Sequence, residues 1–70
     1  ADGPRAGLAL LDRLDDLDTY HLFHAVRGEL LARCGDVGAA RAALERAHTL
    51  TDSTAERRHL TRRLESLTPR

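Results

Sequence analysis

An all-α fold of about four helices, arranged as antiparallel helical hairpins, is predicted for this chain by three features of its sequence. The composition is 41% hydrophobic, 31% charged and 3% aromatic, which is typical of a domain built from alanine and leucine and argues against disorder. Apolar residues recur every three or four positions, as on one face of an α-helix. Short turn and capping segments separate these runs, so each helix is expected to be the antiparallel neighbour of the next.

The first two helices are separated by an acidic stretch. A helix is predicted over about residues 4–14, because Pro4 fits a first helical turn and apolar residues follow at helical spacing: Ala6, Leu10, Leu11, Leu14 and Leu17. The second helix is predicted over about residues 20–34, with Asp18 or Thr19 as its cap. One side of it is expected to carry Phe23, Val26, Leu30, Leu31 and Cys34, and Gly35 is expected to end it in the left-handed conformation.

The second half of the chain predicts two more helices. Asp36 is expected to begin a third helix, whose apolar stripe contains Val37, Ala40, Ala43, Leu44, Ala47 and Leu50. The run Ser53-Thr54-Ala55-Glu56 has the form of a capping box. It is expected to open a fourth helix over residues 53–67, with Leu60, Leu64 and Leu67 as a narrow apolar seam.

Residues 20–51 have the spacing of one tetratricopeptide-like repeat. Gly28, Ala40 and Ala47 match the small residues of that pattern, and Leu44 stands where an aromatic residue is usual. Small residues at these positions let two antiparallel helices approach closely, and such a unit serves contact rather than chemistry. Ala6 and Leu10 are spaced like Ala40 and Leu44, so residues 4–14 are interpreted as the second helix of a preceding repeat and residues 53–67 as a capping helix. Residues 1–70 are therefore expected to form one domain, the C-terminal piece of a longer protein.

Three segments carry a more specific resemblance: GLALLDRL, YHLFHAVRGELLARCGDVGAARAALERAHTL and ERRHLTRRLESL. Together they resemble the C-terminal tetratricopeptide extension of a group of bacterial extracytoplasmic-function (ECF) sigma factors. The family pattern is matched by Tyr20-His21, Arg27-Gly28 and Glu29-Leu30-Leu31, whereas Gly28 stands where alanine is usual. The resemblance implies a module that regulates transcription initiation through protein contact, with the sigma regions of the same chain or RNA polymerase as partner.

The residues expected to bind a protein partner lie on the second helix. In stacked helical pairs the first helix of each repeat lines the concave surface, which assigns Leu22, Ala25, Glu29 and Arg33 to a groove. Tyr20 or Phe23 is the expected aromatic anchor, and the family pattern adds His21. Arg27 lies at the edge of the apolar face, where its stem is expected to pack. We also consider that it anchors the acidic segment through Asp15, Asp16 or Asp18.

No catalytic or metal site is predicted, and no cofactor is expected. His21 and His24 lie three positions apart on one helical face, but no third ligand stands nearby in the sequence. Cys34 lies beside a helix C-terminus, which disfavours its thiolate form. His48 and His59 stand singly. On the fourth helix, Arg58 and Arg62 are expected on the outer side, whereas Arg57 and Arg63 flank the leucine seam. A solvated face is expected for these arginines, with a patch for an acidic protein or a DNA backbone as the alternative.

The overall charge and the apolar pattern exclude some partners. The formal net charge is zero, and specific reading of nucleic acid is not expected. No apolar run approaches the roughly 18 residues of a spanning helix, and the start lacks the features of a signal peptide. A single cysteine excludes an internal disulfide and suits a reducing cytoplasm. The exclusive use of arginine among basic residues suggests a GC-rich bacterial genome.

The sequence leaves three alternatives open. The chain can belong to the repeat portion of another bacterial regulator, or it can be a helical oligomerisation domain whose exposed first helix pairs with its own copy. The third is a small enzyme or metal protein that uses His21 and His24.

Overall fold

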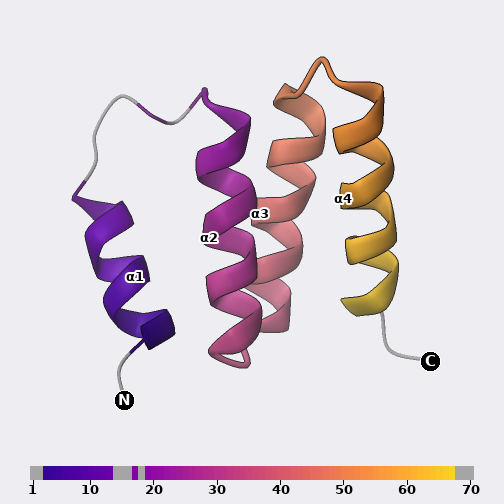
Figure 1. Ribbon diagram of the computed structural model, residues 1–70. Helices are drawn as coiled ribbons and strands as arrows, with labels where there is room; N and C mark the ends of the chain where they lie inside the picture. Colours follow the sequence, from indigo (N-terminus) through magenta and orange to yellow (C-terminus); the bar gives the residue numbers. More distant parts are fainter. Residues whose placement is uncertain (1–2, 14–16, 18, 68–70) are drawn as a thin grey trace.

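The structure is a computed structural model that describes residues 3–13, 17 and 19–67, and this part of the chain contains four α-helices and no strand (Figure 1). The helices are α1 (Gly3–Asp12), α2 (His21–Arg33), α3 (Val37–Leu50) and α4 (Thr54–Leu67). Consecutive helices run in opposite directions. The predicted all-α fold of about four helices is confirmed.

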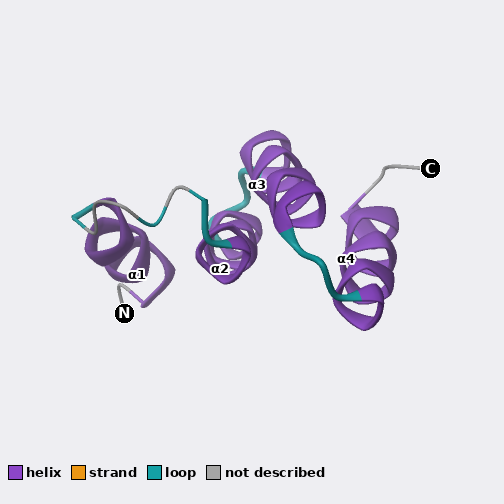
Figure 2. Cartoon of the chain, turned by 90° about the horizontal axis from the view of Figure 1, so that it is seen from above, coloured by secondary structure: helices purple, strands orange, loops and turns teal. Residues whose placement is uncertain are grey.

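The helices form a single thin, zigzag layer. Viewed along the helices, α3 lies on one side of the line that joins α2 and α4 (Figure 2). The most extensive packing is between α2 and α3, while α1 packs on α2 and α4 packs on α3. The molecule measures 33 × 31 × 16 Å, so each inner helix has a neighbour on both sides and one face left to solvent.

The beginning of α2 differs from the prediction. Its cap residue is Tyr20, which has an extended backbone and no side-chain capping bond; Thr19 is therefore not the cap, and Asp18 lies outside the described residues. The Tyr20 carbonyl accepts a hydrogen bond from the Phe23 N–H at 3.1 Å, and the Tyr20 N–H donates to the Leu17 carbonyl at 3.0 Å. Backbone groups thus close the turn that a side chain was expected to cap. Helix α1 likewise ends at Asp12, before the expected Leu14.

The connection between α2 and α3 is a Schellman motif followed at once by a new cap. The Gly35 N–H donates to the Ala32 carbonyl and the Asp36 N–H to the Leu31 carbonyl, each at 3.0 Å, which is the hydrogen-bond pattern of that motif. Gly35 has a positive φ of 87°, as predicted. The Asp36 carboxylate then accepts from the Ala39 N–H at 3.1 Å, so one aspartate ends one helix and begins the next.

Replacing Gly35 is expected to strain this turn without touching any packed side chain. A Cβ at residue 35 would meet open space, so the cost of Gly35→Ala is conformational and amounts to about 1–2 kcal/mol of unfolding free energy. Gly35→Asn is the matched control, because asparagine tolerates the left-handed region better. Urea unfolding followed by circular dichroism measures both; equal losses would contradict the conformational explanation.

The turn between α3 and α4 uses half of the predicted capping box. The Glu56 N–H donates to Ser53 Oγ at 3.1 Å. The Ser53 N–H donates to Thr51 Oγ1 at 3.2 Å, the position that the Glu56 carboxylate would take in a complete box. Thr51 is buried, so this turn is tied to the core of the layer.

Two small clusters of buried side chains hold the layer together. The first contains Leu31, Ala40 and Ala43, and the second contains Leu44, Ala47 and Leu60. Gly28 is the point of closest approach, because a Cβ added there would lie 2.7 Å from Leu44 Cγ and 3.3 Å from the Ala40 carbonyl oxygen. Leu44 fills the space that a side chain at residue 28 would occupy.

Three apolar residues expected in buried stripes face solvent instead. Leu10 is 62% exposed, Val26 49% and Val37 41%. In a layer one helix thick, each helix buries only the flanks that meet its neighbours, so part of an apolar stripe stays outside. Conversely, His24 is buried. No helix of the described chain is long and apolar enough to span a membrane.

Candidate functional site

The side of α2 that faces away from α3 exposes an aliphatic pair. Leu22 is 42% and Val26 49% exposed, and residues four apart lie one above the other on a helix. Arg33 is also exposed on this helix, at an angle between those of Leu22 and Val26. We call these three residues the α2 outer surface. Leu22 and Arg33 were predicted to line the groove, whereas Val26 was assigned to the buried side.

Two of the predicted groove residues are placed differently. Ala25 is half-buried and packs against the cluster of Leu44, Ala47 and Leu60. Glu29 is half-buried and turns toward α4. The predicted set is thus divided between the α2 outer surface and the contact with the last helix.

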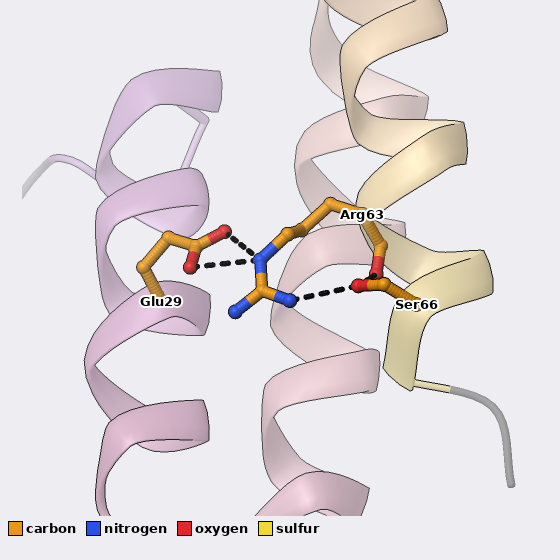
Figure 3. A network of polar contacts seen from close by, with 3 residues as sticks. All are labelled: Glu29, Arg63 and Ser66. Carbon is orange, nitrogen blue, oxygen red and sulfur yellow. Dashed lines mark hydrogen bonds and ion pairs between the residues drawn. The ribbon is translucent and has the colours of Figure 1, made fainter.

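The contact between α2 and α4 is an ion pair. Arg63 Nε lies 2.7 Å from Glu29 Oε2 and 2.9 Å from Glu29 Oε1, so one N–H is shared between both carboxylate oxygens. Arg63 Nη1 donates to Ser66 Oγ at 2.8 Å, and that hydroxyl donates to the Arg63 carbonyl at 2.6 Å. Figure 3 shows the Glu29 and Arg63 side chains reaching toward one another from α2 and α4. The serine holds the guanidinium in place for the carboxylate.

The environment of this pair sets its energy. The Glu29 and Arg63 side chains are 41% and 31% exposed, so solvent screens the attraction and the pair contributes on the order of 0.2–1 kcal/mol. The hydrogen bond to Glu29 raises the pKa of Arg63 above its already high ordinary value, and burial opposes this rise. Since the folded-state pKa is raised, the stabilisation that comes from Arg63 is present at neutral pH and is lost only as pH rises through that high value.

A double-mutant cycle is expected to show this coupling. Glu29→Gln and Arg63→Gln should each lower the free energy of unfolding by up to about 1 kcal/mol, and the double variant should lose less than the sum. Glu29→Arg combined with Arg63→Glu reverses both charges and should recover much of the loss. Additive losses in urea unfolding would show that the two side chains do not interact in solution.

At the start of α2, Tyr20 and His21 lie close together. Tyr20 is 48% exposed, and its ring packs edge-on against the His21 ring with centroids 5.6 Å apart. His21 Nδ1 is buried without a hydrogen-bond partner. The buried His24 ring packs edge-on against Phe23 at 5.1 Å, at the position where the repeat pattern has its first aromatic residue.

Arg27 makes an ion pair with Asp12 of α1. Its Nε lies 3.8 Å from Asp12 Oδ1. The predicted partners Asp15, Asp16 and Asp18 lie outside the described residues. Beside Arg27 is an open hollow of about 450 Å³, which is also lined by Phe23, His24, Ala39, Ala42, Ala43 and Arg46.

The described residues include His21, His24 and Cys34, the side chains considered above for metal binding or catalysis. No group of three or more His, Cys, Asp or Glu side chains is placed there to hold a metal ion. Cys34 is a free, half-buried thiol at the end of α2. The absence of catalytic, metal and cofactor sites stays a prediction.

The basic residues of α4 are divided between two sides of the helix. Arg63 faces α2 and pairs with Glu29. Arg57, Arg58 and Arg62 are exposed and, with Thr54 and Thr61, line a shallow hollow of about 350 Å³. That this side of α4 caps a helical array stays a prediction.

Comparison with known proteins shows that the chain is 34% identical over 67 residues to an uncharacterized protein of Rhizobium meliloti (strain 1021). The match covers 94% of this chain. The chain spans only 16% of the length of that relative. No family model matches the chain, and no solved structure matches it.

Proposed function

We propose that this chain is a non-enzymatic protein-interaction module, the C-terminal extension of an ECF sigma factor that modulates transcription initiation. The observation that carries the proposal is the α2 outer surface, where Leu22 and Val26 expose apolar side chains at helical spacing. Exposed aliphatic groups beside charged residues are what a partner helix or loop covers in a protein interface. The contact is made with the sigma regions of the same polypeptide or with RNA polymerase.

The packing beneath this surface supports a binding role. Helices α2 and α3 are in close contact where Gly28 meets Leu44 and Ala40. The Glu29–Arg63 ion pair joins α2 to α4. Residues on a helix held from two sides keep a constant geometry, which lowers the entropic cost of binding. The scaffold thus presents Leu22 and Val26 in a fixed arrangement.

The resemblance to ECF sigma factor extensions supplies the identity of the partner. Tyr20, His21, Arg27 and Glu29 match the family pattern; Tyr20 is the cap residue of α2 and the other three lie on that helix. The relative from Rhizobium meliloti is much longer than the matched segment, which is consistent with a module carried by a larger protein. Sigma-type DNA-binding helices encoded upstream of Ala1 would support the assignment; another type of regulator encoded there would overturn it.

In vitro transcription tests the proposed regulation. The full-length gene product is compared with a version that carries Leu22→Ser and Val26→Ser, each with core RNA polymerase and the cognate promoter. Loss of two interface anchors is expected to change transcript yield by about tenfold or more, since anchors typically contribute 1–2 kcal/mol or more each. Val37→Ser is the matched control, because Val37 is equally exposed but lies on α3.

Self-association is the second candidate, favoured by the exposure of Tyr20 at the start of α2 and of Leu22 and Val26 on that helix. Sedimentation equilibrium of the 70-residue chain separates the two. A monomer at high concentration, together with altered transcription by the Leu22/Val26 double variant, supports the regulatory proposal. A dimer that this variant dissociates, with unchanged transcription, makes the surface a dimer interface and overturns it.

A further inference from the structure

The face of α1 turned away from α2 carries uncovered apolar side chains. Leu10 is 62% exposed, the highest value among the large hydrophobic side chains of the described chain. Ala6 and Ala9 are also exposed. Ala9 and Leu10 follow Ala6 by three and four positions, so the three residues lie on the same side of the helix. The opposite flank of α1 is occupied, because Gly7 and Leu8 pack against α2 and its neighbours, with the Gly7 backbone close to Leu30.

The same three residue types recur 34 positions later on α3, where they are buried. Ala40, Ala43 and Leu44 correspond to Ala6, Ala9 and Leu10, and they are 0%, 6% and 1% exposed. The occupied flanks correspond as well: Gly7 lies beside Leu30, and Arg41 and Leu64, each 34 positions later, line one hollow between α3 and α4. Helix α1 therefore resembles α3 in having two sides suited to packing, of which α2 covers one.

On α3 the structure shows what fills the equivalent side. Helix α2 lies across it, with Leu31 packed on Ala40 and Ala43 and Gly28 leaving room for Leu44. A helix that covers α1 in the same way needs a small residue opposite Leu10 and a leucine three positions further on to pack against Ala6 and Ala9.

We infer that the Ala6–Ala9–Leu10 face of α1 is the docking surface for a helix of the α2 type, antiparallel to α1 and joined to it by a short turn. The occupant is defined by a Gly-x-x-Leu pattern, as Gly28 and Leu31 form in α2. This surface is distinct from the α2 outer surface, and its test measures stability and association rather than transcription.

The chain itself supplies the probe. A copy of residues 20–36 is placed directly before Gly3, in the register that α2 has before Val37. This extended protein is expected to unfold at a temperature at least ~5 °C higher than the 70-residue chain, a shift typical of about 1 kcal/mol in a domain of this size. Leu10→Glu should then lower the unfolding temperature by ~5 °C or more in the extended protein and by less than ~2 °C in the 70-residue chain.

The control extension has valine in place of the copied glycine, which keeps or improves helix propensity but fills the space that Leu10 requires. It should remove the rise in unfolding temperature. An extended protein that melts like the 70-residue chain, or one that tolerates Leu10→Glu equally well, would overturn the inference. A dimer of the 70-residue chain that Leu10→Glu dissociates would assign the face to a second copy and also overturn it.

Discussion

Leu60→Ala is expected to release α4 and to be the most destabilising of the substitutions considered. Leu60 is 1% exposed and forms a buried cluster with Leu44 and Ala47, while the rest of the α4 interface is only partly buried. Truncating a buried leucine to alanine costs about 2–5 kcal/mol, a large fraction of the stability of a small domain. Urea unfolding measured by circular dichroism at 222 nm gives the loss.

The structure also predicts which helix loses most stability in Leu60→Ala. Without Leu60, the remaining attachment of α4 is the partly exposed seam of Leu64 and Leu67 and the Glu29–Arg63 pair. Amide hydrogen exchange should therefore accelerate in α4 more than in the α2–α3 hairpin. Leu10→Ala is the matched control: Leu10 is 62% exposed, so its truncation should change stability by less than about 0.5 kcal/mol. Similar losses for the two leucines would contradict the observed burial.

Gly28→Ala is expected to destabilise the protein by about 1–3 kcal/mol, the range typical of overpacking. The new methyl group would lie 2.7 Å from Leu44 Cγ. Leu44 is 1% exposed and cannot swing aside without disturbing Ala47 and Leu60. The other close atom is the Ala40 carbonyl oxygen, which moves only if α2 and α3 separate. Thermal unfolding followed at 222 nm measures the effect.

Gly38→Ala is the control that isolates this steric effect. Gly38 is also helical, and a Cβ there meets nothing within 4 Å, so alanine should stabilise α3 by about 0.5–1 kcal/mol through helix propensity. The two glycine-to-alanine changes should thus have opposite signs. Stabilisation by both would mean that α2 and α3 are further apart in solution than in the structure.

Most of the helical architecture could be predicted from local sequence. Gly35 and Asp36 specify the end of α2 and the start of α3 because a left-handed residue and a capping carboxylate act within a few residues of themselves. The start of α2 could not be predicted in this way, since backbone bonds of Tyr20 replace the expected side-chain cap. The spacing of Gly28, Ala40 and Ala47 indicated a close helical pair, and the structure adds that Leu44 occupies the space at Gly28.

The candidate site was predictable only in part. Leu22 and Arg33 were assigned to a groove; the structure shows both exposed on α2, and partner binding there stays a prediction. Helical angles placed Val26 on the buried side because periodicity reports an apolar stripe and not the number of neighbours that cover it. Arg63 was expected beside the leucine seam, but its partner could not be predicted, since nothing in the sequence links it to a carboxylate 34 positions away.

The sequence by itself determined that the chain is helical, where the α2–α3 and α3–α4 turns lie and which small residues are available for close packing, because these properties depend on neighbours within one or two helical turns. Only the tertiary structure decided which apolar faces are covered and which charges meet. Burial of Leu60, exposure of Leu10 and the pairing of Glu29 with Arg63 all depend on where the other helices lie. Helices distant in sequence set these environments, and a local pattern carries no information about their positions.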